Sequence, residues 1–290
     1  MSRPIGRRGA AALGLAALAA SPVRAQQKTP RIVSVGSALT EIFYALGAEN
    51  LLVGVDTTSL YPPQAKSLPQ VGYMRALSAE GVLSLKPTLI MATTGAGPAA
   101  TLDQLKATGI EVVILPDRYD YDSVVKKIEA VGKATGKVTE ADALIARGQA
   151  DMKALADRLA AAPNKPRVLF LLSMSGGAPQ AAGRDTAADG IIHLAGGVNA
   201  IDGYVGYRPL TPEAVIASRA DYILVPRQSV ESMGGVDKVL EQPSLRQTPA
   251  GGNGKLLQFD ILLLLGFGPR TPQAAAELAA ALHPELATAN

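Results

Sequence analysis

The chain has 290 residues, 48% of them hydrophobic, and its 28 Lys and Arg against 25 Asp and Glu give a formal net charge of +3. This length suffices for two lobes with their own cores, the hydrophobic content excludes general disorder, and so small and dispersed a charge disfavours nucleic acid as a partner. The sequence contains no cysteine, so disulfides, thiolate catalysis and cysteine-ligated metal are excluded.

The first 25 residues have the pattern of an export signal. Positive charge that includes the pair Arg7-Arg8 precedes a run of small and apolar residues from Gly9 to Ala20, and Val23-Arg24-Ala25 offers an A-x-A-like cleavage site. The run is too short to span a bilayer. We therefore expect residues 1–25 to be a signal peptide, exported by the general or the twin-arginine route and cleaved near Ala25. The mature protein would lie in the periplasm without spanning the membrane.

Strand and helix patterns alternate along the first half of the mature chain, which is typical of a parallel sheet covered by helices. Strand patterns occupy residues 31–35, 51–55, 89–92 and 111–115, and helical patterns occupy 39–46, 80–85 and 102–108. A long Ala-rich helical pattern then runs from Thr139 to Ala161 and stops at Pro163.

A second alternating series follows this long helix. It comprises strands at 168–172, 222–225 and 256–259, the apolar run 191–194, a helix after Thr211 and a final helix at 271–282. The whole apolar run from Leu256 to Leu265 has the composition of a buried strand.

These patterns predict two α/β lobes joined by one long helix, with a ligand cleft between the lobes. The expected divisions are an N-terminal lobe at 30–137, a linking helix at 138–165 and a C-terminal lobe at 166–290. A single continuous doubly wound sheet is the alternative architecture.

An internal repeat favours the two lobes. The segment Val71–Leu83 (VGYMRALSAEGVL) returns as Val205–Ile216 (VGYRPLTPEAVI) with a slip of one residue. This separation far exceeds the roughly 20–50-residue period of a solenoid. We therefore expect each lobe to present a Tyr/Arg loop, followed by a helix that starts Ser/Thr-x-Glu, toward a shared cleft.

Tyr73 and Arg75 are the first candidate binding residues. Positions i and i+2 of an extended segment lie on one face, so the two side chains should be adjacent. A guanidinium stabilises an anionic phenolate, which is a suitable ligand for ferric iron and an established axial ligand of haem. Residue type alone, however, favours the interpretation that Tyr73 is an amphipathic residue at the rim of the cleft, with its hydroxyl in water.

Glu80 and Glu213 form a second informative pair. Each is the second helical residue after a Ser or Thr cap, where a carboxylate is favoured by the helix dipole by up to about 1 kcal/mol. That explanation suffices for one glutamate, but it does not explain why both lobes present the same acid.

The motif Val71–Gly81 resembles the axial-tyrosine loop of periplasmic haem-binding proteins of bacterial haem ABC importers. Gly203–Leu210 resembles the facing loop of that family's C-terminal lobe, and Leu265–Thr271 resembles its C-terminal glycine turn. The resemblance covers the mature chain and implies two Rossmann-like lobes bridged by a helix. Siderophore and cobalamin carriers share all but the first motif.

The resemblance also implies roles for particular residues. Tyr73 would be the axial ligand of haem b with Fe(III), and Arg75 would support it. Tyr207 and Arg208 would face them from the other lobe, with Arg208 pairing with a propionate or supporting Tyr73. Arg208 in a surface ion pair is the competing interpretation. Glu80 and Glu213 would dock into arginine pockets of the two permease subunits.

The predicted function is therefore that of a monomeric haem carrier serving an inner-membrane ABC permease, and not that of an enzyme. A siderophore or corrinoid receptor is the alternative. An enzyme lacks support because no nucleotide fingerprint or Ser/His/Asp pattern is present. The two histidines, His193 and His283, are expected to be structural, which disfavours a zinc or manganese receptor.

Two glycine-containing loops follow apolar strands, and loops at the ends of parallel strands face the ligand crevice. Thr93–Pro98 and Ser173–Ala178 do not match a phosphate-binding pattern. We expect their small residues to let a flat macrocycle approach the backbone.

Overall fold

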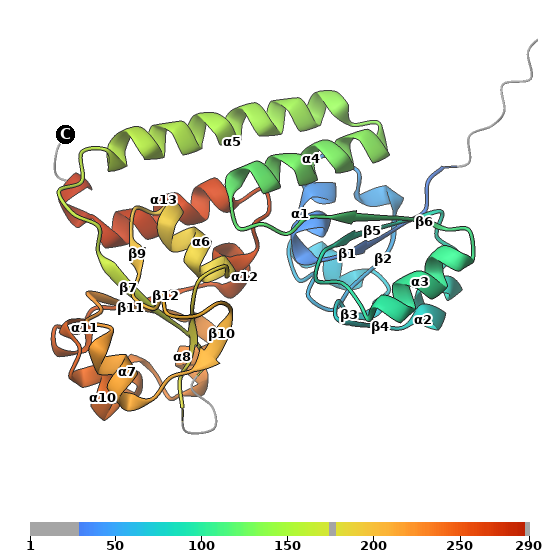
Figure 1. Cartoon of the computed structure of the whole chain (residues 1–290). Helices are drawn as coiled ribbons and strands as arrows, with labels where there is room; N and C mark the ends of the chain where they lie inside the picture. The colour runs from blue at the N-terminus through green and yellow to red at the C-terminus, as the bar shows by residue number, and fades with distance from the viewer. Residues whose placement is uncertain (1–28, 174–177, 288–290) are drawn as a thin grey trace, which may run out of the picture.

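A computed structural model of the chain describes residues 29–173 and 178–287. Two α/β lobes lie side by side beneath a long bridging helix (Figure 1). The expected signal peptide and residues 174–177 of the second glycine-containing loop lie outside the described residues. The fold class predicted from the sequence is confirmed, and the exact lobe boundaries stay a prediction.

The N-terminal lobe is built on a parallel sheet with strand order β2-β1-β5-β6. Its strands are β1 (Ile32–Val35), β2 (Leu52–Val55), β5 (Leu89–Thr93) and β6 (Glu111–Leu115). A small hairpin pairs β3 (Gly72–Tyr73) with β4 (Ala76–Leu77). The helical segments are α1 (Ser37–Ala45), η1 (Glu49–Leu51), η2 (Pro63–Ser67), α2 (Ala79–Ser84) and α3 (Ala99–Ala107).

The C-terminal lobe has its own sheet, ordered β10-β8-β7-β11-β12 with β9 beside β7. The strands are β7 (Arg167–Ser173), β8 (Gln180–Ala182), β9 (Val198–Asn199), β10 (Tyr207–Pro209), β11 (Tyr222–Pro226) and β12 (Leu256–Phe259). Its helical segments are α6 (Ala187–Leu194), α7 (Pro212–Ala217), α8 (Arg227–Ser232), α9 (Val236–Leu240), α10 (Pro243–Arg246), α11 (Pro249–Gly252), α12 (Ile261–Leu265), α13 (Thr271–Leu282) and η3 (Pro284–Ala287). The two sheets share no strand, so the single-sheet alternative is wrong.

One long helix bridges the lobes, and a second helix that the sequence patterns did not indicate packs beside it. α5 (Val138–Leu159) is the expected linking helix and runs across both lobes, with α4 (Tyr121–Thr135) beside it (Figure 1). α4 ends at Gly136, whose φ of 72° is the left-handed conformation that glycine adopts readily at a helix terminus. The chain therefore reverses sharply before α5 starts. Of the described residues, 29–173 and 178–287, none belongs to a helix long and apolar enough to cross a membrane.

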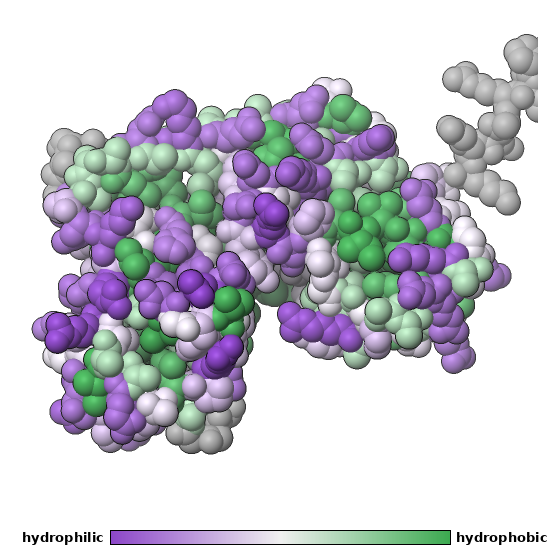
Figure 2. Space-filling view, in the orientation of Figure 1, coloured by the Kyte–Doolittle hydropathy of each residue, from purple (hydrophilic) through white to green (hydrophobic). Residues whose placement is uncertain are grey.

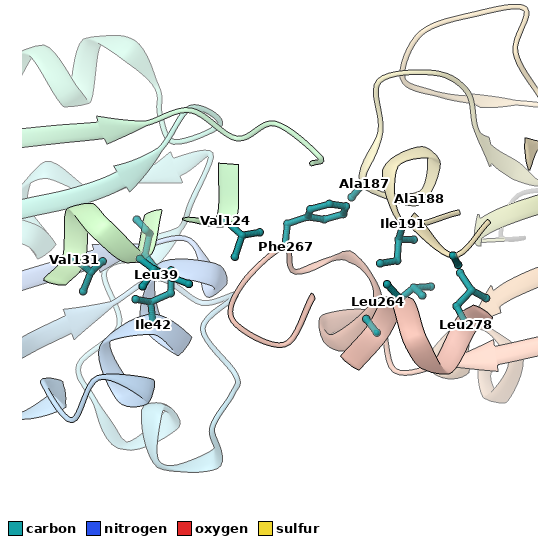
Figure 3. Close-up of a cluster of buried hydrophobic side chains, with 14 of the residues drawn as sticks. Leu39, Ile42, Val124, Val131, Ala187, Ala188, Ile191, Leu264, Phe267 and Leu278 are labelled. Atoms are coloured by element: carbon teal, nitrogen blue, oxygen red, sulfur yellow. The ribbon is translucent and has the colours of Figure 1, made fainter. Parts of the chain in front are cut away.

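One hydrophobic core joins the two lobes. It contains Leu39 and Val124 from the N-terminal lobe together with Ile191 and Leu278 from the C-terminal lobe. Figure 3 shows Phe267 between these two groups, and its ring packs edge-on against Tyr119 at a centroid distance of 5.4 Å. The lobes therefore share buried apolar surface.

Phe267 belongs to the interlobe segment, Gly266–Arg270, which connects α12 to α13. Its backbone carbonyl accepts a hydrogen bond at 3.1 Å from Lys127 Nζ, a fully buried ammonium that also pairs with Asp117 at 2.7 Å. Arg270 forms a bidentate ion pair with Glu41 on α1, with N–O distances of 2.7 and 2.8 Å. Polar contacts thus reinforce the shared core.

The apolar run from Leu256 to Leu265 is not a single strand, so that expectation is wrong for its second half. β12 ends at Phe259, and α12 begins after Asp260. Asp260 Oδ1 accepts a hydrogen bond from the backbone N–H of Leu263 at 2.9 Å, which caps the helix. This local capping bond starts a helix at Ile261, so the apolar residues after Asp260 are helical and lie at the edge of the cleft.

Candidate functional site

A cavity of about 580 Å³ lies between the lobes. Its N-terminal wall is formed by the start of α1, the β3–β4 turn and the loops after β5 and β6. Its C-terminal wall is formed by the end of β7, the start of α6, β10 and α12. Figure 2 shows the notch that separates the lobes on the side away from the bridging helix. Its position at the carboxyl ends of parallel strands and its size are typical of a small-molecule site.

Tyr73 and Arg75 lie on the β3–β4 hairpin, which contributes Met74 and Arg75 to the cavity wall. Gly72 has a φ of 100°, a conformation that glycine tolerates, and allows the chain to enter the tight turn. Arg75 Nη1 donates a hydrogen bond to Tyr73 Oη at 3.3 Å, so the predicted adjacency of the two side chains is confirmed. Arg75 lines the cavity, whereas Tyr73 lies outside the cavity lining and is 44% exposed. The Tyr73 phenol is thus bonded to a cation of the cavity wall, and Tyr73 itself remains open to solvent.

Tyr207 faces the same cavity from β10 in the C-terminal lobe. Its ring packs edge-on against Phe170 at 6.4 Å. Burial of the phenol oxygen raises the pKa of Tyr207 to about 12, although the Ala188 backbone N–H and the Arg75 charge oppose the rise. Tyr207 is therefore a neutral hydrogen-bonding group at physiological pH.

Tyr119 is a cleft residue that the sequence patterns did not indicate. It follows β6 and lines the cavity. Burial raises the pKa of Tyr119, the charge of Asp117 raises it further, and Arg75 opposes both effects. Arg75 therefore acts electrostatically on Tyr119 and Tyr207 as well as bonding to Tyr73. One guanidinium therefore interacts with phenols from both lobes.

Arg208 lies apart from this group. Neighbouring residues of a strand point to opposite faces, so Tyr207 turns to the cleft while Arg208 turns away. The guanidinium carbon of Arg208 lies 5.0 Å from the centre of the Tyr204 ring. The Tyr204 hydroxyl donates to the backbone carbonyl of Ala181 at 3.1 Å. In this structure Arg208 forms a cation–π contact, and its predicted role in binding stays a prediction.

Glu80 and Glu213 occupy matching positions in the first turns of α2 and α7, and both are exposed. The Ser78 hydroxyl accepts from Gly81 N at 3.1 Å, and the Thr211 hydroxyl accepts from Ala214 N at 3.3 Å. Both predicted N-caps are thus confirmed. Hydrogen bonds from its own backbone N–H and from the Thr211 hydroxyl lower the pKa of Glu213, which keeps it anionic.

α12 supplies apolar surface that was unforeseen because its residues were expected to form a strand. Ile261, Leu262 and Leu265 line the cavity opposite the small residues Thr94 and Gly95. These two belong to the first glycine-containing loop, whose predicted position at the crevice is confirmed. The i, i+1, i+4 spacing of the three apolar residues after an Asp cap was the available signal for a helix.

The histidines lie outside the cavity lining. His193 is exposed, with Nε2 3.5 Å from Asp189, and His283 is buried, with Nδ1 3.3 Å from Glu285. Within residues 29–173 and 178–287, no group of three or more His, Cys, Asp or Glu could hold a metal ion. The described residues therefore offer phenols rather than imidazoles at the cleft.

Comparison with known proteins places this geometry in context. The sequence pattern of the periplasmic binding protein family matches residues 32–260. The periplasmic heme-binding protein RhuT from Roseiflexus sp. RS-1 is 43% identical, with a TM-score of 0.83 over 89% of this chain and 100% of that one. The periplasmic heme-binding protein BhuT, solved with two hemes, is 40% identical, with a TM-score of 0.85 and the same coverage. A vitamin B12-binding protein of Yersinia pestis is 29% identical over 74% of this chain and 75% of its own length.

Proposed function

The chain belongs to the periplasmic binding protein family, and we propose that it binds ferric haem between its lobes and delivers it to an inner-membrane ABC permease. The observation that carries this proposal is the hydrogen bond to the exposed Tyr73 phenol from Arg75, which lines the interlobe cavity. Two proteins that are at least 40% identical over 89% of the chain are periplasmic heme-binding proteins, which supports haem over other cargo.

Tyr73 would coordinate the iron as a phenolate. An anionic oxygen is a strong ligand for Fe(III), and tyrosine is among the known axial ligands of haem. Arg75 would stabilise the anion and orient it toward the cleft, because an adjacent opposite charge favours the ionised phenol. Tyr207, which stays protonated, would contribute ring contacts and a hydrogen bond and would not coordinate the iron.

The remaining cavity wall suits a flat apolar ring. The α12 side chains Leu262 and Leu265 offer aliphatic surface, while Gly95 on the opposite wall lacks a side chain that would obstruct the ring. Burial of apolar surface contributes roughly 25 cal/mol per Å², so a porphyrin face would gain several kcal/mol here. The protein would act as a carrier: iron coordination and burial supply its selectivity, and no reaction is required of it.

Delivery would use Glu80 and Glu213. Each lobe presents one of these carboxylates on an exposed first helical turn, next to the hairpin or strand that borders the cleft. A permease with two basic pockets would bind one carboxylate from each lobe at the same time. We place the protein in the periplasm as a monomer, after removal of residues 1–25.

Haem binding is tested by titrating the purified protein with ferric haem and following the Soret and charge-transfer absorption. We expect Tyr73→Phe to lose the tyrosinate charge-transfer band and to bind haem at least about tenfold more weakly, a loss of 1.4 kcal/mol or more. Tyr44→Phe, which removes a phenol on α1 outside the cavity lining, is the matched control. Unchanged spectra and affinity in Tyr73→Phe would remove this residue from the iron site.

The corrinoid alternative is tested in the same experiment. The vitamin B12-binding relatives make cyanocobalamin the natural competing ligand. Binding of cyanocobalamin by the wild type, unaffected by Tyr73→Phe and without haem binding, would replace the haem assignment.

A further inference from the structure

Lys127 is a charged residue on the buried face of α4. The side chain is fully buried, and its neighbours on that face include the apolar residues Val124, Ile128 and Val131. Lysine is almost never fully buried unless it is paired, because an ammonium group without a partner loses its hydration. Replacement of a buried ion pair by apolar residues is often neutral or stabilising, so a stable fold does not require a cation at this position.

The partners of Lys127 connect it to the interlobe cavity. Nζ donates to Asp117 Oδ1 at 2.7 Å and to the backbone carbonyl of Phe267 at 3.1 Å. Asp117 follows β6 and lines the cavity, whereas Lys127 lies outside the cavity lining. The Asp117 side chain is 28% exposed, so the ion pair has its anion at the cavity wall and its cation behind that wall.

The cavity wall carries few charges. Of the described residues that line the cavity, only Arg75 and Asp117 are charged at neutral pH. After burial, the charge of Asp117 is the second cause that raises the pKa of Tyr119 in the same wall, so this carboxylate acts on groups in the cavity. Without the Lys127 charge, Asp117 would offset the positive charge of Arg75 and repel an anionic ligand, in an interior where charges interact more strongly than in water.

We propose that Lys127 is a specificity-determining residue, which makes the cavity suitable for an anionic macrocycle without touching that ligand. Its ammonium group offsets the Asp117 charge from behind the wall, so that Arg75 gives the cavity lining its positive character. This inference rests on the proposed function, because haem carries two ionised propionates. A neutral macrocycle would gain nothing from the arrangement.

The test compares the affinity for ferric haem with the affinity for its dimethyl ester, which keeps the iron and the ring but lacks ionised carboxylates. We expect Lys127→Met to weaken haem binding about tenfold, because the uncompensated Asp117 charge repels the propionates, and to leave the affinity for the ester unchanged. The double variant Lys127→Met with Asp117→Asn should restore haem affinity to within about twofold of the wild type. Both variants lack the bond to the Phe267 carbonyl, so the difference between them measures the Asp117 charge alone.

A third variant tests the same charge with the Lys127 side chain in place. In Asp117→Asn the amide oxygen can still accept the hydrogen bond from Lys127, so the buried ammonium group keeps a partner. The wall then has a larger net positive charge. Haem should bind several times more tightly than it does to the wild type, and the ester should bind equally well to both.

Lys126→Met is the matched control, because it removes an exposed ammonium group from the preceding position of α4. It should alter neither affinity. If Lys127→Met weakened haem and ester equally, or weakened neither, or if the double variant were as weak as the single one, the inference would be refuted while haem binding stood. If the wild type bound neither compound, the proposed function would fail, and this inference would fail with it.

Discussion

Tyr207 offers a direct test of cleft electrostatics. Burial raises its pKa from 10.0 to about 12, and the raised value belongs to the folded state alone. Phenolate absorbance should therefore be titrated in the wild type and in Tyr207→Phe. The difference between the two curves should show one tyrosine that ionises near pH 12. Because this pKa is higher in the folded state, the contribution of Tyr207 to the free energy of unfolding is complete below pH 10. It is lost as the pH rises from 10 toward 12, where the unfolded state gains by ionising first.

The contribution should be modest because Tyr207 is 36% exposed and solvent screens part of the effect. Chemical denaturation between pH 9 and 12 would measure it, with Tyr222→Phe as a control on β11 of the same lobe. A Tyr207 phenol that titrates near pH 10 would contradict its burial. It would also reopen the possibility of a second anionic phenol at the iron.

Local sequence was informative for Tyr73 and Arg75 because both lie in one short hairpin. Their spacing of two residues is enough to bring the side chains together. Tyr119 could not be found in this way, since its place in the cleft depends on where β6 ends relative to the other lobe. For Arg208 the motif could be recognised in the sequence, but the direction of the side chain could not be predicted from it. The alternation of side chains along β10 places the guanidinium against Tyr204.

At the scale of elements, the capping pattern predicted two helix starts, and the family resemblance supplied the hypothesis that the glutamates after them dock on the permease. α2 and α7 begin at Ser78 and Thr211, and each carries its glutamate in the first turn. Charge reversal of both residues, Glu80→Lys with Glu213→Lys, should abolish haem uptake by the permease. Haem affinity should stay unchanged, because neither side chain lines the cavity. Uptake in cells and haem titration of the purified variant measure the two effects.

The matched control is Glu129→Lys, which reverses an exposed charge on α4, beside the bridging helix. It should preserve uptake, because α4 lies on the opposite side from the cleft mouth. If uptake persisted in the double variant, the permease would not recognise these carboxylates. A loss of haem affinity would instead move them into the ligand site.

Long periodic elements and strands flanked by turns could be predicted from sequence, since the pattern alone identifies α5, β6 and α13. The division at Asp260 was missed because an unbroken apolar run suits a strand as well as a buried helix. Here the Asp260 cap marks the point where the strand ends and the helix begins. α4 was overlooked although Val124, Ile128 and Val131 have helical spacing, and it carries Lys127, which contacts the other lobe.

At the scale of the whole molecule, the interlobe segment determines whether the lobes behave as one unit. Residues 266–270 pack Phe267 into the shared core, and Gly268 lies against Ala38 at the start of α1. Arg270 then pairs with Glu41, and its guanidinium lies 3.6 Å from the centre of the Tyr61 ring. None of these contacts could be read from the sequence, because the Glu41–Arg270 partners are 229 residues apart.

Removal of Arg270 should therefore weaken the whole fold. Glu41 is 4% exposed, and burial raises the pKa of its carboxyl while Arg270 opposes the rise. In Arg270→Met the carboxylate would remain buried without its partner. We expect the free energy of unfolding to fall by about 3 kcal/mol, the lower end for a broken buried pair because Arg270 keeps some exposure. Chemical denaturation followed by circular dichroism measures this change.

Two further variants separate the ion pair from general damage. The double variant Glu41→Leu with Arg270→Met should recover most of the loss, because it leaves no unpaired buried charge. Lys153→Met breaks the exposed pair with Asp157 on α5 and should cost less than about 1 kcal/mol. Because the shared core couples the lobes, the wild type should unfold in one transition, and Arg270→Met should separate it into two. A single transition of undiminished stability in Arg270→Met would show that apolar packing around Phe267 is sufficient to hold the lobes together.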